Sequence, residues 1–218
     1  IFAAGEDLVA TLRETRRTHR ILRVGALATL SRNFQLAFLR PVLGRPDVEV
    51  ILRSGGMAEL LRALADLELD AVLTSEAPAA GGFVAHRLAE EPVSLVGRPA
   101  LLAGRASLAE RLAAAPLILP TPDSGLRAGF EALRERLGVT LLIAAEVDDM
   151  AMMRLLAREG VGLAVLPPIV VRDELASGEL QEAERLPGLV QPFHAVTVAR
   201  RFPNPLLREL LRGEVMVR

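Results

Sequence analysis

The sequence predicts an α/β fold made of two units of similar size. Apolar stretches of strand length alternate with amphipathic stretches of helix length along most of the 218 residues, a pattern typical of parallel sheets with helical crossovers. The pattern occurs twice, before and after a junction near 93–99. Hydrophobic residues make up 51% and charged residues 24%, which suits one large domain or two small ones.

In the first half, the helix expected at 31–45 begins at Ser31, a preferred N-cap residue. Pro41 kinks this helix or ends it early, because proline has no backbone N–H to donate. The residues expected on its buried face are Leu36, Leu39 and Val42. The other expected elements are a helix end at 1–16, strands at 21–27, 48–55 and 70–76, a helix at 57–69, and two extended segments within 81–99.

In the second half, Gly138 ends the helix expected at 123–138, since glycine accepts the left-handed conformation common after a helix. Two acids at the start of the helix expected at 148–160 stabilise it, because their negative charges interact favourably with the positive end of the helix dipole. The other expected elements are helices at 107–114, 169–178 and 204–213, and strands at 116–120, 139–147, 161–168 and 194–201. The strand at 194–201 could carry the chain back to the first unit, and two crossings would make a cleft with a hinge.

Composition excludes several classes of chemistry. There is no cysteine, so disulfides, thiol catalysis and cysteine-ligated metals are ruled out. All 26 positive residues are arginine, which excludes Schiff-base lysines and the P-loop lysine. The net charge of −1 lacks the basic footprint of a nucleic-acid-binding domain. The one basic cluster, Arg13–Arg20, is interpreted as a solvated linker, with a phosphate contact as the alternative.

The ends and apolar runs of the chain predict no membrane or secretory segment. No apolar run reaches the roughly 18 residues that a membrane helix needs. The first residues carry early acids and no basic n-region, and the chain does not begin with Met. We therefore expect no membrane partner, and the chain as given to be a fragment or a processed form.

A catalytic role for Ser124 would need a base, and the residues do not supply one. His19 falls in the predicted linker, while His86 and His194 fall in extended apolar segments, where a structural role is expected. The stretch around Ser124 also lacks the G-x-S-x-G elbow. The neighbouring acids Asp148 and Asp149 point different ways at a helix start, and are predicted to cap it. We expect no catalytic residue, no metal and no cofactor.

Polar or small residues follow several predicted strands, where the chain turns into a helix. Ligands of open parallel sheets bind outside the carboxyl ends of strands, and helix N-termini there supply amide donors. Together these junctions predict a small-molecule pocket, although each hydroxyl alone is more often a cap. The junction residues are Ala28, Thr29, Leu30 and Ser31; Ser54, Gly55 and Gly56; Thr74, Ser75 and Glu76; Thr121 to Ser124; and Asp148 with Asp149.

Three stretches, "LRVGAL", "LRALADLELDAVLTSE" and "LLAREGVGLAVLPP", resemble the effector-binding domain of LysR-type transcriptional regulators. The late glycine–proline motif of the third stretch is the most specific, and the resemblance covers 21–218. Within the family, "ALATLSRNF", "PTPDSGLR" and "EVDDMAMMRLL" are most similar to the sodium-responsive activator of a sodium/proton antiporter. Glu68 stands where the family usually has a glycine or a polar residue.

This resemblance implies two Rossmann-like subdomains joined by two crossover strands, in a periplasmic-binding-protein-like (type 2) fold with an interdomain cleft. Residues 1–20 would be the end of a linker helix and a linker. Subdomain I would comprise 21–95 and 200–218, and subdomain II would comprise 96–199. The DNA-reading winged helix-turn-helix would precede this chain.

The resemblance also implies which residues would meet the effector. Gly97 would sit at the hinge, and Pro167 and Phe202 would line the wall of the cleft. Arg98 and Arg127 are candidates to hold a carboxylate, whereas Glu76 and Asp148 would favour a cation. Carried over by position, the remaining effector-binding residues are Ala28, Thr29, Ser31, Thr74, Ser75, Thr121, Ser124 and Asp148.

The function that the resemblance implies is ligand sensing within a bacterial, cytoplasmic transcription factor. The effector would be a small molecule or an ion, and the domain would form a homodimer or homotetramer. The expected dimer is antiparallel and side by side, with the helix at 31–45 against a helix of the second unit. Phe34 and Phe38 would be either on that surface or in the core. Two alternatives remain at this point: a solute-binding protein of a transporter, and an enzyme of the prephenate dehydratase type.

Overall fold

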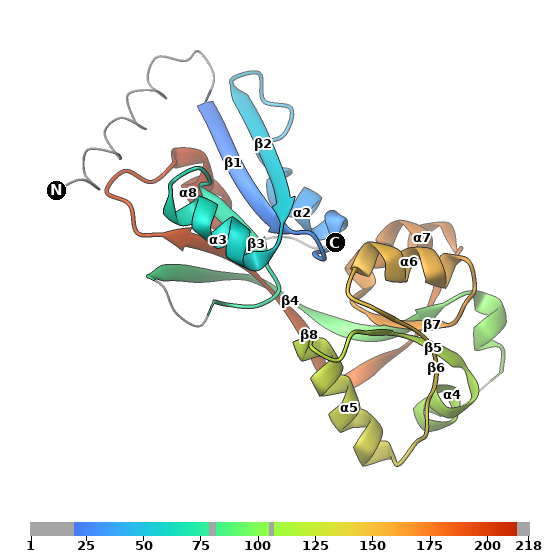
Figure 1. Ribbon diagram of the computed structural model, residues 1–218. Coiled ribbons are helices and arrows are strands. Elements are labelled where there is room, and N and C mark those ends of the chain that lie inside the picture. The colour runs from blue at the N-terminus through green and yellow to red at the C-terminus, as the bar shows by residue number, and fades with distance from the viewer. Residues whose placement is uncertain (1–19, 79–81, 105–106, 213–218) are drawn as a thin grey trace. The chain divides into compact units, whose positions relative to one another are not determined.

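The computed structural model describes residues 20–78, 82–104 and 107–212 (Figure 1). The described chain forms two compact units. The first contains the described parts of 20–30, 35–89 and 192–212, and the second contains 31–34 and the described parts of 90–191. The helix end expected at 1–16 and His19 lie outside the described residues.

The first unit is built on three parallel strands. These are β1 (Arg20–Leu27), β2 (Val48–Gly55) and β3 (Ala71–Thr74), and β1 lies between the other two. The β1–β2 and β2–β3 connections run in opposite directions across the sheet. Right-handed crossovers therefore place their helices on opposite faces, as Figure 1 shows for α2 (Arg32–Leu39) and α3 (Met57–Ala65).

Both helices end earlier than the sequence pattern predicts. The residues after α2 form turns around Pro41, which ends the helix rather than kinking it. Leu36 is 46% exposed, so its expected burial was wrong, whereas Leu39, Val42, Phe34 and Phe38 are buried. After α3, Leu67 takes a positive φ of 60°, and the amides of Glu68 and Leu69 bond back to the carbonyl of Ala63.

A buried polar cluster fixes the last helix of the first unit, α8 (Pro205–Arg212). Asn204 caps it by accepting a hydrogen bond from the Leu206 amide at 3.1 Å. The Asn204 amide group donates to the Ile21 carbonyl at 2.8 Å and to Asp70 at 3.1 Å. Asp70 also accepts from the Arg23 backbone at 2.8 Å, so α8 is tied to β1 and to the start of β3.

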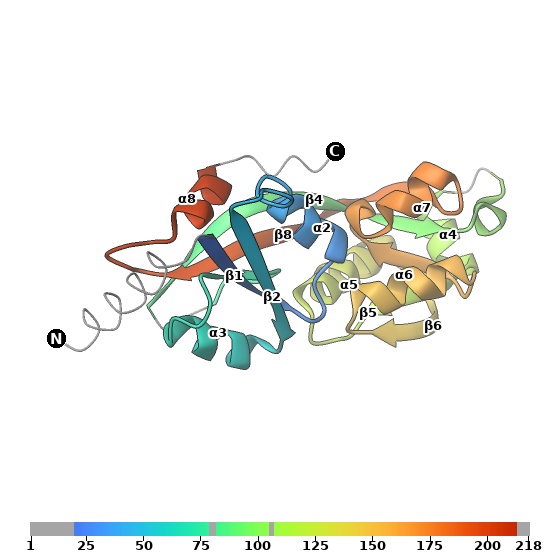
Figure 2. The ribbon, with the colours of Figure 1, turned by 90° about the horizontal axis from the view of Figure 1, so that it is seen from above.

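Two long strands each contribute residues to both units (Figure 2). They are β4 (Phe83–Gly97) and β8 (Gln181–Val198), which are hydrogen-bonded neighbours. The first was expected as two extended segments, and the second as a strand at 194–201 only. Each is instead continuous, with β8 antiparallel to β3 and β4 antiparallel to β7 (Leu163–Leu166).

The second unit repeats the plan of the first. Its central strand β5 (Pro116–Pro120) pairs in parallel with β6 (Leu142–Val147) on one side and with β7 on the other. The connections again run in opposite directions, and α5 (Gly125–Leu137) and α6 (Met150–Arg158) lie on opposite faces in Figure 1. The unit also holds α4 (Leu108–Ala114), α7 (Arg172–Ser177) and the 3-10 turns Pro99–Leu102 and Pro168–Val171.

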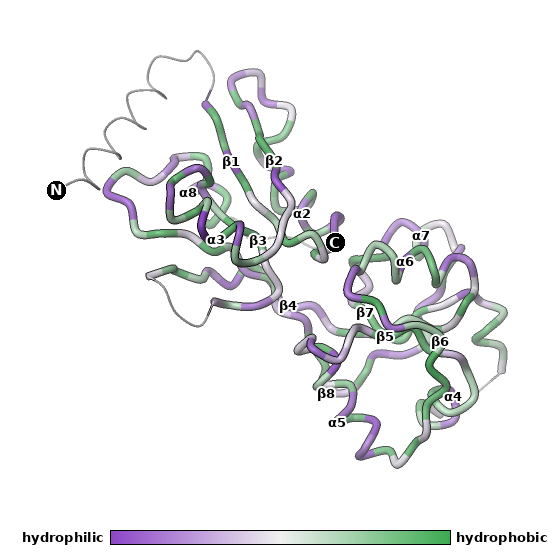
Figure 3. The backbone as a smooth tube through the Cα atoms, in the orientation of Figure 1, coloured by the Kyte–Doolittle hydropathy of each residue, from purple (hydrophilic) through white to green (hydrophobic). Residues whose placement is uncertain are grey.

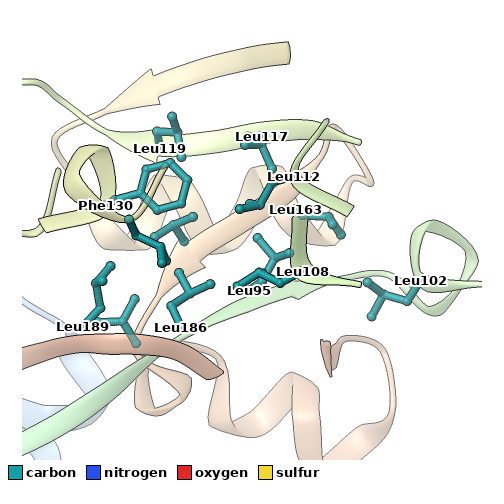
Figure 4. Close-up of a cluster of buried hydrophobic side chains, with 13 residues drawn as sticks. Leu95, Leu102, Leu108, Leu112, Leu117, Leu119, Phe130, Leu163, Leu186 and Leu189 are labelled. Carbon is teal, nitrogen blue, oxygen red and sulfur yellow. The ribbon is translucent and has the colours of Figure 1, made fainter. Parts of the chain in front are cut away.

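The core of the second unit is mainly leucine, as the composition predicts. Phe130 of α5 is fully buried among leucines from four strands and from α4 (Figure 4). Figure 3 shows the same contrast along the chain, with a hydrophobic β5 and hydrophilic stretches in α5. In the described part of the chain, no helix is long and apolar enough to cross a membrane.

Candidate functional site

In the first unit, the carboxyl ends of β1 and β3 bring two polar segments to one edge. Ala26 pairs with Leu73, so the chain leaves both strands at the same level. Ala28 is exposed, its amide donates to the Gly55 carbonyl at 3.1 Å, and Thr29 follows in the same turn. This edge lies at a topological switch point, because the chain runs from β1 outward on one side and returns to β3 on the other.

The two predicted residues at the end of β3 differ in how their hydroxyl groups are used. Thr74 is fully buried, and its hydroxyl both donates to the Glu76 carbonyl at 2.9 Å and accepts from the Glu76 amide at 3.1 Å. Ser75 is half-buried at the same edge. Thr74 therefore shapes the turn, while Ser75 and Thr29 carry the more accessible hydroxyl groups.

Ser31 is grouped by its contacts with the second unit. It is 3% exposed, and its hydroxyl oxygen accepts from the Phe34 amide at 3.4 Å, at the start of α2. Next to it, the Asn33 side chain donates to the carbonyls of Ile169 and Val170 at 3.0 and 3.3 Å. Thr29 is grouped with the first unit and Ser31 with the second, although only Leu30 lies between them in the sequence.

In the second unit, the carboxyl ends of three parallel strands meet at one edge. Pro120 pairs with Val147, and the Thr121 amide donates to the Val147 carbonyl at 3.2 Å, so Thr121 lies beside Asp148. Ile118 pairs with Ala164, which puts Pro167 at the level of Thr121 on the other side. Asp148 is exposed and Pro167 is buried.

Ser124 is the N-cap of α5. Its backbone is extended, with φ −83° and ψ 141°, and its hydroxyl oxygen accepts from the Arg127 amide at 3.0 Å. A hydrogen bond from Thr121 lowers the pKa of the exposed Asp123 carboxyl, so these two side chains engage each other. Thr121 and Asp123 therefore serve the loop before the helix, while Ser124 caps the helix itself.

The acids after β6 act separately. Asp149 caps α6, where its carboxylate accepts from the Ala151 amide at 2.9 Å, as predicted. Asp148 stays exposed, and Glu146 points to the other helix, where it accepts from Arg127 at 2.6 Å. Acid–base chemistry by a coupled pair has no support in this arrangement.

The two arginines considered for a carboxylate contact are engaged within the second unit. The Arg127 guanidinium donates to Glu131, Glu146 and the Pro120 carbonyl. Burial works to lower the pKa of Arg127, but its hydrogen bonds to the two glutamates outweigh burial and raise it. Arg98 donates to the Arg158 carbonyl at the end of α6. Sequence reasoning missed this role of Arg127, although Glu131 at i+4 was a readable signal.

For Gly97 and Phe202, expected at a hinge and in a cleft wall, the structure gives the local surroundings, and both roles stay predictions. Gly97 ends β4 inside the second unit, and a Cβ there would lie 2.4 Å from Leu163 Cδ2, so glycine permits close packing. Phe202 belongs to the first unit, is 53% exposed, and stacks with the Arg201 guanidinium 5.4 Å from its ring centre.

The described histidines do not form a catalytic arrangement with Ser124. His86 Nε2 lies 3.0 Å from Thr197 Oγ1, and the Nδ1 atom of His194 is buried with no hydrogen-bond partner in the described chain. Burial, and then the charge of Arg87, lower the pKa of His194. Among residues 20–78, 82–104 and 107–212, no three His, Asp or Glu side chains are grouped to hold a metal ion.

Solved structures share this fold. The regulatory domain of Synechocystis CcmR in complex with 2-PG is 18% identical, has a TM-score of 0.67, and covers 91% of this chain and 99% of its own. The apo regulatory domain of HypT from Salmonella typhimurium is 17% identical, has a TM-score of 0.66, and covers 93% and 98%. At these identities the likeness concerns the fold alone.

The sequence also matches a curated relative and a family model. A RuBisCO operon transcriptional regulator of Acidithiobacillus ferrooxidans is 30% identical over 166 residues, which span 73% of this chain and 54% of that protein. The chain thus spans about half the length of this relative. The model of the LysR substrate binding domain matches residues 15–212. The two-unit α/β fold and this match together show that the chain belongs to the LysR substrate-binding domain family.

Proposed function

We propose that the chain senses a small effector and regulates transcription through a DNA-binding part of a longer protein. The observation that carries this proposal is the repeated edge: in each unit, polar side chains and helix N-termini follow the strands at a topological switch point. Neither edge brings a histidine or a paired acid to a serine, so binding is the chemistry that they support. We place its action in the bacterial cytoplasm, where the DNA is.

In this proposal, the effector contacts of the first unit are the hydroxyl groups of Thr29 and Ser75. Those of the second unit are the hydroxyl groups of Thr121 and Ser124 and the carboxylate of Asp148. Ser124 Oγ accepts the capping hydrogen bond, which leaves its proton for a ligand. The other residues of the proposed site would contribute backbone groups or shape the surface around the effector. They are Ala28, Ser31, Thr74, Gly97, Pro167 and Phe202.

Regulation in this proposal follows from differential affinity. An effector shifts the protein between two arrangements only if it binds one of them more tightly. A shift from 1:99 to 99:1 needs a roughly 10⁴-fold difference in affinity. The proposed contacts at strand ends suit this task, because they join helices whose N-termini can move with the ligand.

We further propose that the chain pairs with a second copy of itself through two exposed apolar surfaces. Surface A lies on α2 and β2 of the first unit, and surface B on β6 and α6 of the second. β2 and β6 are the two edge strands of the sheet, and large exposed apolar side chains on such elements are typical of protein interfaces. Surface A comprises Leu36, Leu43, Ile51 and Leu52, and surface B comprises Leu142, Ile143, Met152 and Leu155.

A thermal-shift screen tests the effector proposal, because a ligand that binds only the folded state raises the melting temperature. The first three probes are bound in structures of similar fold: 2-PG in the CcmR regulatory domain, shikimate in the effector-binding domain of QuiR, and bromide in the HypT regulatory domain. The fourth probe is sodium, since the antiporter-activator subgroup stays a prediction. For the best probe, Ser124→Ala and Thr29→Ala should each weaken binding at least fivefold.

Ser107→Ala is the matched control for Ser124→Ala. Ser107 caps α4 in the same unit, through a reciprocal pair with Glu110, and lies away from the carboxyl edge of the strands. Its loss should lower stability without changing the affinity for the probe. Unchanged affinity in both Ser124→Ala and Thr29→Ala would show that the proposed contacts are wrong.

A further inference from the structure

We propose that Arg127 positions the second unit's effector contacts and does not itself touch the effector. The inference rests on the proposed function, since it concerns how the residues around Thr121, Ser124 and Asp148 are held. It differs from the family-based expectation that Arg127 holds a ligand carboxylate.

Arg127 joins three secondary-structure elements of the second unit. Its Nη1 group donates to the Pro120 carbonyl at 2.9 Å, at the last residue of β5, and to Glu146 Oε1 at 2.6 Å, near the end of β6. Its Nε–H donates to Glu131 Oε1 at 2.7 Å, one turn further along α5. One side chain therefore links two strands and a helix beneath the proposed contacts.

The residues that Arg127 anchors stand next to the proposed contacts in the sequence. Thr121 directly follows Pro120, and Asp148 stands two residues after Glu146. The backbone N–H of Arg127 meets the Ser124 hydroxyl, so the same residue also fixes the rotamer of Ser124. Movement of Arg127 would shift all three contacts at once.

The Arg127 guanidinium is largely engaged by groups of the second unit. Three of its five N–H groups are used in the bonds above, and the side chain is only 9% exposed. Its single positive charge faces two carboxylates, Glu131 and Glu146, and Glu131 is shared with Arg134. These two carboxylates already balance the charge of Arg127, which weakens the attraction of the guanidinium for an anionic ligand.

A lysine in place of Arg127 separates the two roles. Lysine keeps the positive charge but lacks the planar fork that donates in three directions. A residue that contacts an anion through its charge would keep much of its function as lysine. A residue that positions two strand ends through its geometry would not.

The experiment measures amide hydrogen exchange residue by residue in the whole chain. In Arg127→Lys, the amides of Thr121, Ser124 and Ala128 should exchange at least tenfold faster. These amides bond to the carbonyls of Val147, Thr121 and Ser124, which surround the proposed contacts. The amides of Arg111 and Ala115 in α4 should keep their rates. Glu146→Gln is a milder second variant, which should accelerate the Thr121 amide in the same direction.

Arg111→Lys is the matched control, since Arg111 also donates to two carbonyls, those of Leu102 and Gly104, in the same unit. It should leave the three amides near Ser124 unchanged. Unchanged rates at those amides in Arg127→Lys would overturn the inference. An equal acceleration of α4 would also overturn it, because Arg127 would then serve only global stability.

A binding arm separates this inference from the proposed function. With any of the four probes that binds the original chain, Arg127→Lys should lose as much affinity as Ser124→Ala. Affinity retained in Arg127→Lys but lost in Arg127→Gln would make Arg127 a direct contact and overturn the inference. If none of these probes binds the original chain, the proposed effector panel has failed, and the exchange rates still decide the role of Arg127.

Discussion

The Ser124 hydroxyl oxygen accepts a hydrogen bond from the Arg127 amide at 3.0 Å, while the Arg127 side chain reaches back to the carbonyl of Pro120. The two residues thus close a loop around residues 120–127 from both ends. A serine that looks like a nucleophile in the sequence is therefore first a helix cap. The same bond also orients its hydroxyl group, which is what a binding role would require.

Replacing Ser124 with alanine should lower the free energy of unfolding by about 1 kcal/mol, the usual contribution of an N-cap side chain. Ser124→Asp should keep most of the stability, because a carboxylate also accepts from the amides of the first turn. Urea denaturation followed by circular dichroism measures both. Equal losses in the two variants would contradict the capping role.

Gly162 is the position where a single methyl group should be most harmful. A Cβ there would lie 2.4 Å from the carbonyl oxygen of Pro116, which is backbone and cannot swing aside. Gly162→Ala should therefore cost about 2–3 kcal/mol, the range of strained overpacking, because β5 and β7 must move apart. Chemical denaturation measures this loss.

Gly56→Ala is the control for Gly162→Ala. Gly56 has a negative φ of −78°, and no atom lies within 4 Å of a Cβ built there. Gly56 is the N-cap of α3, where alanine is less favourable than glycine, so alanine should lower the free energy of unfolding by no more than about 1 kcal/mol, less than at Gly162. A similar loss in both variants would mean that the contact with Pro116 is not the cause.

The order of strands and helices was predictable from the sequence, because hydrophobic periodicity reports which residues face a core. The parallel sheets and the two units followed from that alternation. What periodicity could not show was the continuity of β4 and β8. Their two ends belong to different units, so no single face of either strand is apolar along its whole length.

The candidate site was predictable as positions and not as contacts. The junctions after the strands were readable from polar residues such as Thr29, Thr121 and Asp148. The partners of these residues depend on side-chain geometry that a one-dimensional pattern lacks. Thr74 and Ser124 illustrate this, because both hydroxyl groups form hydrogen bonds with backbone groups. The sequence alone does not distinguish such a hydroxyl group from one that is available to a ligand.

The Glu131–Arg127 ion pair should make part of the stability depend on pH. Burial works to raise the pKa of Glu131, but the hydrogen bonds from Arg127 and Arg134 outweigh it and hold the pKa below the usual 4.5. A carboxyl group whose pKa is lower in the folded state stabilises the fold above its unfolded pKa, and this contribution disappears as the pH falls through the folded pKa.

Glu131→Gln should therefore be less stable than the original chain at pH 7, and the difference should shrink as the pH falls below about 4. Urea midpoints at several pH values measure it. Glu135→Gln is the control on the same helix, because Glu135 is well exposed and forms only a long ion pair, 3.7 Å between its Oε1 and Nη2 of Arg134. A difference for Glu131→Gln that stays constant from pH 7 to pH 3 would contradict the ion-pair explanation.

Charge placed on either apolar surface should prevent the proposed pairing of two copies. Leu52 of β2 is 58% exposed on surface A, and Leu155 of α6 is 47% exposed on surface B. Burying a glutamate against apolar side chains costs several kcal/mol, so Leu52→Glu and Leu155→Glu should each halve the mass in analytical ultracentrifugation. Val84→Glu, a similarly exposed apolar position on β4, should keep the dimer mass. A dimer that survives both Leu52→Glu and Leu155→Glu must be held by residues outside surfaces A and B. If the original chain is already a monomer, the proposed pairing does not occur in the part of the protein that this chain represents.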